Sequence, residues 1–193
     1  MSYKALRHTY GFGVHSPFAF NLVKDVVRPG RGYGWYGYED IDAAVNSRRG
    51  GLNEDIGAAV NSRRDSLKTE RQAKMFLRLL SFLNPRSLFL PLGIDPLFYI
   101  AAKASDKRMR IERKPKMACE CEMIATHASF ISLDRLKEHI AKPGNSIVIM
   151  DLPDGWADAL FELLPEGLML HSKRNAIIIH RPDMMKLSYN ILL

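Results

Sequence analysis

Cysteine is scarce in this chain: its 193 residues include only two, Cys119 and Cys121. They lie one residue apart in a segment whose pattern predicts a helix, where side chains at that spacing point to different sides and rarely form a disulfide. A metal site of the usual cysteine type would need further partners at suitable spacing. We therefore expect two free thiols, buried or half-buried, and no metal.

Long apolar runs and secretory features are also absent. No run approaches the roughly 20 apolar residues that a bilayer crossing needs, and the N-terminus, Met1-Ser2-Tyr3-Lys4, lacks the apolar core of a secretory signal. The composition, 47% hydrophobic and 25% charged residues, is typical of a globular domain. The sequence predicts a soluble, cytoplasmic protein with no membrane partner.

Signatures of several common enzyme classes are missing as well. The chain has no phosphate-binding GxxxxGK, no CxxC pair and no Ser-His-Asp order. His127 has no evident partner in the pattern, and His180 and Asp183 flank Arg181, whose charge opposes a cation. These observations favour neither a catalytic triad nor a metal site.

The charge balance is positive, with a formal net charge of +7 and a pI near 9.5. Basic side chains gather between residues 103 and 116: Lys103, Lys107, Arg108, Arg110, Arg113, Lys114 and Lys116. Such a run either contacts a nucleic-acid backbone or keeps a connection between elements solvated, and the second is the commoner case.

Residues 1–68 are predicted to form an N-terminal extension of helices and loops. It opens with a lead rich in glycine and aromatic residues, in which Ser16-Pro17 predicts the start of a short helix. Residues 39–53 and 54–68 then repeat a 15-residue unit and differ at four offsets. Both copies have helical chemistry, but glycines such as Gly57 weaken a helix, so it stays open whether both are helical.

Residues 69–193 alternate between helical and strand patterns. This alternation predicts right-handed crossovers and a parallel sheet with helices on both faces. The predicted strands are 87–92, 109–112, 128–132, 146–150 and 176–180, and the predicted helices are 69–83, 97–104, 115–126, 133–141 and 156–164.

This order of elements resembles that of class I S-adenosylmethionine-dependent methyltransferases, especially small O-methyltransferase-like proteins with a Gly-Phe-Gly-Val-His-Ser-Pro-Phe lead. The resemblance implies an α/β, Rossmann-like methyltransferase fold whose mainly parallel sheet has about five strands in the order 3-2-1-4-5. The chain ends soon after the fifth predicted strand, which implies that the family's last two strands, the final one antiparallel, are missing. The segments that carry the resemblance are 11–18, 84–93, the strand ending at Glu112, and 147–151.

The same resemblance places an S-adenosylmethionine site at the end of the first strand. There the family has an acidic residue followed by a glycine-rich turn that lets the backbone approach the cofactor. Gly93 matches the first glycine, whereas Pro91 stands at the acidic position and the second glycine is deleted. Asp95 either replaces the lost carboxylate or caps the helix that begins at Pro96.

Two further carboxylates match family positions. Glu112 corresponds to the residue that accepts hydrogen bonds from the cofactor ribose, although pairing with a neighbouring arginine is an equal alternative. Asp151 ends the fourth predicted strand, close to the substrate in O-methyltransferases. The predicted cofactor-binding residues are therefore Gly93, Asp95, Glu112 and Asp151.

The altered turn leaves two functions open. One is S-adenosylmethionine-dependent methyl transfer, weak or lost in a degenerate member. The other is a non-catalytic binding or assembly module on the same fold, which could contact nucleic acid through the basic stretch. An apolar fifth strand at the sheet edge, Ile177-Ile178-Ile179, would further favour a homo-oligomer.

Overall fold

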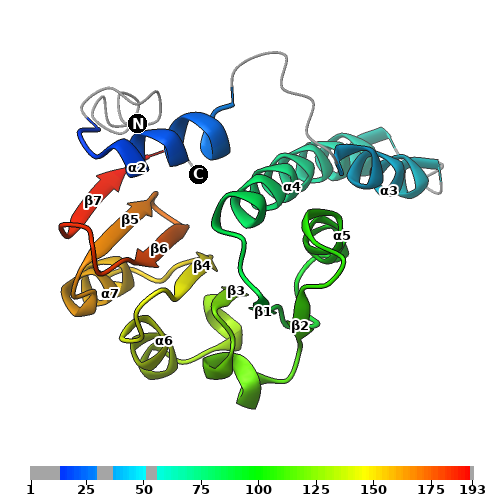
Figure 1. The fold of residues 1–193 in the computed structure, drawn as a ribbon. Helices are drawn as coiled ribbons and strands as arrows, with labels where there is room; N and C mark the ends of the chain where they lie inside the picture. The colour runs from blue at the N-terminus through cyan, green and yellow to red at the C-terminus, as the bar shows by residue number, and fades with distance from the viewer. Residues whose placement is uncertain (1–13, 30–36, 51–55, 192–193) are drawn as a thin grey trace.

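The structure is a computed structural model, and it describes residues 14–29, 37–50 and 56–191. Within these residues seven strands form one mixed sheet in the order β2-β1-β3-β4-β6-β5-β7 (Figure 1). The strands are β1 (Ser87–Phe89), β2 (Arg110–Glu112), β3 (Met123–His127), β4 (Ser146–Met150), β5 (Gly167–His171), β6 (Ala176–His180) and β7 (Leu187–Asn190).

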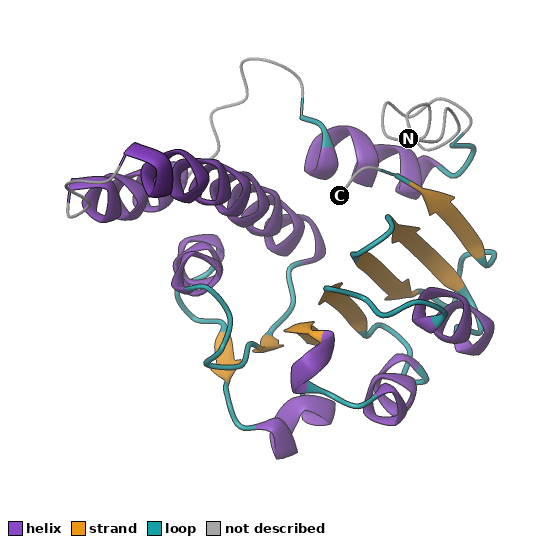
Figure 2. Ribbon diagram, turned by 180° about the vertical axis from the view of Figure 1, so that it is seen from behind, coloured by secondary structure: helices purple, strands orange, loops and turns teal. Residues whose placement is uncertain are grey.

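Helices cover both faces of this sheet, as the sequence predicts (Figure 2). Residues of β4 alternate between the faces: Val148 packs in one core cluster, and Ile147 and Ile149 pack in the other. The helices are α2 (Pro17–Asn21), the π-helix η1 (Leu22–Val27), α3 (Tyr38–Gly50), α4 (Ile56–Leu83), α5 (Pro96–Ser105), the 3₁₀-helices η2 (Pro115–Glu120) and η3 (Ala128–Phe130), α6 (Leu133–Ile140) and α7 (Trp156–Leu163).

The two cores divide the helices between them. On one face, η1, α3, α4 and α5 pack with Leu88 and Val148. On the other face, η2, α6 and α7 pack with Phe89 and Ile149. The molecule is therefore a three-layer α/β/α arrangement in which every central strand is covered from both sides.

The strand count and order differ from the prediction. The sheet has seven strands rather than five, and the predicted order 3-2-1-4-5 is wrong because β3 lies between β1 and β4. The sheet is mostly parallel, but β6 runs antiparallel to both β4 and β5. The short apolar run of β5 and the half-polar β7 have no clear period, which is why the pattern missed them.

The third strand also lies elsewhere than predicted. Residues 115–126 were expected to be helical, yet only a short 3₁₀-helix forms before β3 begins at Met123. Ser87 Oγ accepts a hydrogen bond from the Glu122 backbone N–H at 3.0 Å, and Glu122 O accepts one from Ser146 N at 3.0 Å. These bonds align the segment between β1 and β4, where burial overrides the helical propensity of its alanine, methionine and glutamate residues.

The predicted exposed edge does not exist. β6 lies between β4 and β5, and Ile177, Ile178 and Ile179 are buried. The described edges of the sheet are β2 and β7. The reason for expecting a homo-oligomer through this strand is thereby removed.

The tandem repeat contributes to two helices. The first copy lies mostly in α3, and the second enters α4 at Ile56, which then continues without a break across residue 68. The helix ends at Asn84, whose φ of +50° is the left-handed conformation common after a helix, and whose N–H donates to Leu80 O at 2.7 Å. Both copies are therefore helical where the structure describes them.

The prediction of two free thiols, buried or half-buried, is confirmed. Cys119 is half-buried, Cys121 is buried, and both are free thiols. Burial raises the pKa of the Cys121 thiol to about 11, so it stays protonated near neutral pH. None of the described helices combines the length and the apolar character that a bilayer crossing needs.

Candidate functional site

The parallel strands β1, β2, β3 and β4 end at one edge of the sheet, here called the carboxyl edge. In open α/β sheets, ligands bind outside this edge. The residues predicted from the sequence all follow these strands: Gly93 and Asp95 after β1, Glu112 at the end of β2, and Asp151 after β4. The strand pairing places Glu112 beside Phe89.

Gly93 lies against an aromatic ring. A Cβ atom built on this glycine would be 2.2 Å from Phe130 Cζ, closer than any side chain tolerates. Phe130 ends η3 and is 41% exposed, and its ring lies against Gly93, which is itself exposed. The ring therefore occupies the space in which a side chain at position 93 would lie.

Asp95 is engaged in capping α5. Its Oδ1 accepts a hydrogen bond from Leu97 N at 2.9 Å, and Pro96 occupies the first helical turn. Asp95 and Pro96 thus have the arrangement that is most favourable at a helix start. The capping alternative is the one for which the structure supplies a contact, and a cofactor role for Asp95 stays a prediction.

Glu112 contacts its neighbour on the same strand. Its Oε1 lies 3.7 Å from Arg110 Nε, and both side chains are partly exposed. The backbone of β2 also continues the sheet past β1, because Leu90 N donates to Glu112 O at 2.9 Å. Such an exposed ion pair contributes little to stability, and its carboxylate faces the solvent at the carboxyl edge.

Asp151 pairs with a residue that sequence reasoning missed. Its Oδ2 lies 2.8 Å from His127 Nδ1, and the two side chains are 65% and 30% exposed. His127 ends β3, so a strand placed at 123–127 rather than 128–132 would have predicted this contact across the edge. Asp151 has a φ of +52°, a conformation that aspartate adopts more readily than most residues and that is frequent at functional sites.

The polar side chains at the end of β6, His180, Arg181 and Asp183, are hydrogen-bonded within the protein. Arg181 Nε and Nη2 donate to the two carboxylate oxygens of Asp183 at 2.9 and 3.3 Å, and His180 is buried with Nδ1 at 2.8 Å from Ile140 O. The hydrogen bonds from Arg181 lower the pKa of Asp183 below its ordinary value. In the described part of the chain, no three histidine, cysteine or acidic side chains cluster as metal ligands.

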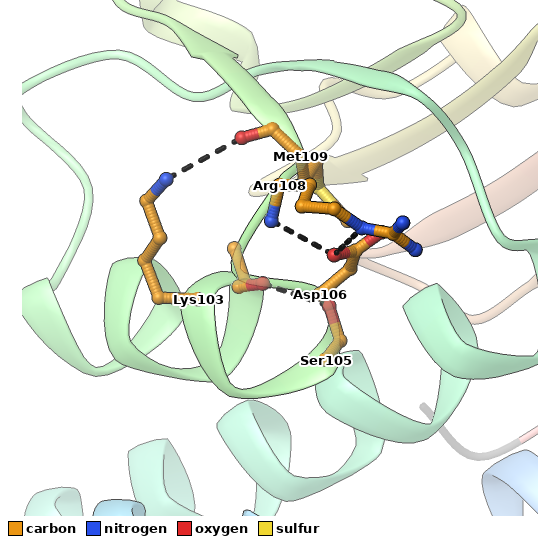
Figure 3. A network of polar contacts seen from close by, with 6 residues as sticks. Lys103, Ser105, Asp106, Arg108 and Met109 are labelled. Atoms are coloured by element: carbon orange, nitrogen blue, oxygen red, sulfur yellow. Dashed lines mark hydrogen bonds and ion pairs between the residues drawn. The ribbon is translucent and has the colours of Figure 1, made fainter.

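Some basic residues between positions 103 and 116 form hydrogen bonds within this same stretch of the chain. Figure 3 shows Lys103 Nζ donating to Met109 O at 3.4 Å, and Arg108 donating from its backbone N to Asp106 Oδ1 at 2.8 Å. The backbone hydrogen bond from Arg108 lowers the pKa of Asp106. These contacts favour the alternative in which the stretch solvates the connection between α5 and β2.

The carboxyl edge thus brings together two pairs, Gly93 with Phe130 and His127 with Asp151. No contact joins Glu112 to either pair among the described residues. Comparisons of the chain with protein-family models, with curated proteins and with solved structures found no match. The function therefore has to be argued from the site itself.

Proposed function

We propose that this chain is a degenerate protein of the class I S-adenosylmethionine methyltransferase type, which keeps the fold as a non-catalytic binding module. The single observation that carries the proposal is the Phe130 ring on Gly93. A cofactor held by the glycine turn needs that space, and the turn also lacks its acidic residue because Pro91 stands there.

The strand order supports the methyltransferase part of the proposal. If β1, β2, β3 and β4 correspond to the family's first, second, fourth and fifth strands, the observed order 2-1-3-4 is the family's order without its third strand. β5 and β6 then correspond to the two last strands, and β6 is antiparallel as the final one should be. Under this correspondence the chain lacks the third strand rather than the last two.

Weak methyl transfer remains a second candidate, and the His127–Asp151 pair favours it. A carboxylate bonded to Nδ1 fixes the tautomer of the imidazole and leaves Nε2 as a base. Such a base, at the carboxyl edge, could take the proton of a methyl acceptor. This candidate requires the cofactor to enter beside Gly93, which the closed edge opposes.

Calorimetric titration with S-adenosylmethionine and with its demethylated product separates the two candidates. We expect no heat and no increase in thermal stability, because a ligand that does not bind the folded state cannot stabilise it. Binding of both compounds to the wild-type chain, with a matching rise in Tm, would contradict the proposal.

A Phe130→Ala variant tests the cause of the closure. Phe130 is partly exposed, so the variant should fold, and removing its ring opens the space beside Gly93. Phe20→Ala is a matched control, because Phe20 is also about two-fifths exposed but lies in α2. If Phe130 is the obstacle, any cofactor affinity should rise in Phe130→Ala and stay unchanged in the control.

A further inference from the structure

A cleft of about 530 Å³ lies where the end of η1, the start of α3 and residues 68–78 of α4 meet. Figures 1 and 2 show α3 and α4 side by side here. The volume lies within the range of small-molecule sites. None of the described residues that line the cleft belongs to the carboxyl edge, so it is a separate candidate site.

The lining of this cleft is strongly cationic. On α4, residues 68, 71, 75 and 78 recur at intervals of three and four, so they share one helix face. Ten residues of α-helix span about 15 Å, which spreads the charge along the cleft. The five cationic lining residues are Arg28, Lys68, Arg71, Lys74 and Arg78.

Arg78 is the buried member of this set, with 7% of its surface exposed. Its Nε donates to Val26 O at 2.6 Å, and Nη1 donates to the Tyr38 hydroxyl, whose ring also lies 5.9 Å from the guanidinium carbon. A guanidinium has five N–H donors, so these two bonds orient it and leave others available. The ion pairs of the described residues include no carboxylate partner for Arg78.

Lys74 differs because its charge is already balanced. Its Nζ lies 2.5 Å from Asp42 Oδ1 and 3.0 Å from Glu70 Oε1. Burial opposes the ammonium charge, but the hydrogen bonds to these two carboxylates raise the pKa of Lys74 overall. Among the described residues, no ion pair joins Lys68, Arg71 or Arg78 to a carboxylate, so these three lining residues add positive charge to the cleft.

The rest of the lining is apolar or aromatic. Val27, Tyr38 and Met75 form part of the wall beside the cations. An excess of positive charge with a buried guanidinium is what a phosphoryl group needs, because arginine binds phosphate through two parallel N–H bonds. The apolar wall suits an organic group carried by that phosphate.

We propose that this cleft binds a small phosphorylated molecule, with its phosphoryl group at Arg78 and Arg71 and its organic part against Tyr38 and Met75. A buried guanidinium next to an apolar wall suits a compact ligand better than an extended polymer. This inference goes beyond the proposed function and does not depend on whether the carboxyl edge is closed.

Titration of the full chain with four probes tests the proposal: pyrophosphate, adenosine 5′-monophosphate, adenosine and a short RNA. We expect heat and a rise in Tm with both phosphorylated small molecules and none with adenosine. Arg71→Gln, at an exposed position, should weaken that binding roughly tenfold by removing one charge-assisted contact. Lys107→Gln, an equal loss of charge on the connection after α5, should leave it unchanged.

Three results would overturn the proposal. They are the absence of phosphate binding at millimolar concentrations, equal weakening by Arg71→Gln and Lys107→Gln, and RNA affinity that grows with length while the mononucleotide does not bind. Arg78→Lys adds a second check. It keeps the positive charge but loses the two parallel N–H bonds to phosphate, so it too should weaken binding of the phosphorylated probes. The phosphate probes test the cleft, and S-adenosylmethionine titration tests the proposed function. A negative result for one proposal therefore does not alter the result for the other.

Discussion

The carboxyl edge and the α4 cleft differ in how their functional groups are used. At the edge, Phe130 covers Gly93 and Asp151 is bonded to His127, so the predicted site residues face partners from the same chain. In the cleft, no ion pair among the described residues joins Lys68, Arg71 or Arg78 to a carboxylate, and Arg78 is buried. On the two proposals above, the ligand of this chain binds in the cleft rather than at the position that the resembled family uses.

The difference also has a structural cause. The edge is formed by short loops between strands and 3₁₀ turns, and η3 places Phe130 directly above the turn after β1. The cleft is formed by α4, a 28-residue helix that is anchored on the sheet through Phe76 and Leu79 while its other face carries the cations. A long anchored helix can hold several like charges in fixed positions that short loops would not.

The largest predicted effect is a loss of folding stability at low pH, caused by His139. Its measurement also shows whether the carboxyl edge and the α4 cleft unfold as one cooperative unit. His139 is fully buried at the amino end of β4, away from both sites, with Nε2 3.1 Å from Ser146 O and Asn145 Nδ2 3.3 Å from Nδ1. Burial, and secondarily the charge of Lys142, lowers its pKa to about 4 from 6.5. Folded His139 therefore stays neutral while the unfolded chain binds a proton below pH 6.5.

The resulting stability is complete above pH 6.5 and is lost as the pH falls toward 4, by roughly 3 kcal/mol. Urea unfolding of wild type and His139→Gln across this range measures it, and the difference between their pH slopes isolates the histidine from the carboxylates. Equal slopes would show that His139 is not the group responsible. Separate transitions for the two regions would show that they are not one unit.

The next effect concerns the contact that closes the edge. Gly93→Ala forces its new methyl group against the Phe130 ring, which should cost about 2 kcal/mol in the wild-type background. In a Phe130→Ala background the same change should cost almost nothing, because the obstructing atoms are gone. Thermal or urea unfolding of wild type, the two single variants and the double variant gives the coupling energy between the two positions. Equal costs of Gly93→Ala in both backgrounds would show that Phe130 does not obstruct the space beside Gly93.

The smallest effect tests how much the His127–Asp151 pair stabilises the edge. Asp151→Asn keeps a residue that tolerates the φ of +52° but removes the charge. Because both side chains are substantially exposed, we expect a loss of about 0.5 kcal/mol in the free energy of unfolding. A loss several times larger would mean that the pair is a structural element of the edge rather than a solvent-exposed contact.

The sequence predicts some elements closely because local signals and tertiary context agree there. The strands at 146–150 and 176–180 have the predicted bounds, and the Asp95 cap forms at the predicted helix start. The strand at Met123 was missed because helical propensity competes with burial between two neighbours. Strand order could not be obtained from periodicity, which specifies the type of an element but not its neighbours.

The candidate site was predictable only in part for the same reason. Asp151 follows a strand whose end the pattern places correctly, but the strand before Gly93 ends at Phe89 rather than at residue 92. His127 and Phe130 depend on the misplaced strand. The cationic cleft was not foreseen, because Arg28, Tyr38 and Arg78 lie far apart in the sequence and only the fold brings them together.

One titration compares the two regions directly. Backbone amide shifts in a ¹⁵N–¹H spectrum, followed first with S-adenosylmethionine and then with pyrophosphate, report which residues meet each compound. We expect S-adenosylmethionine to leave the amide shifts of Gly93, Glu112 and Asp151 unchanged and pyrophosphate to move those near Arg71 and Arg78. Shifts at Gly93, Glu112 and Asp151 with S-adenosylmethionine would contradict this expectation.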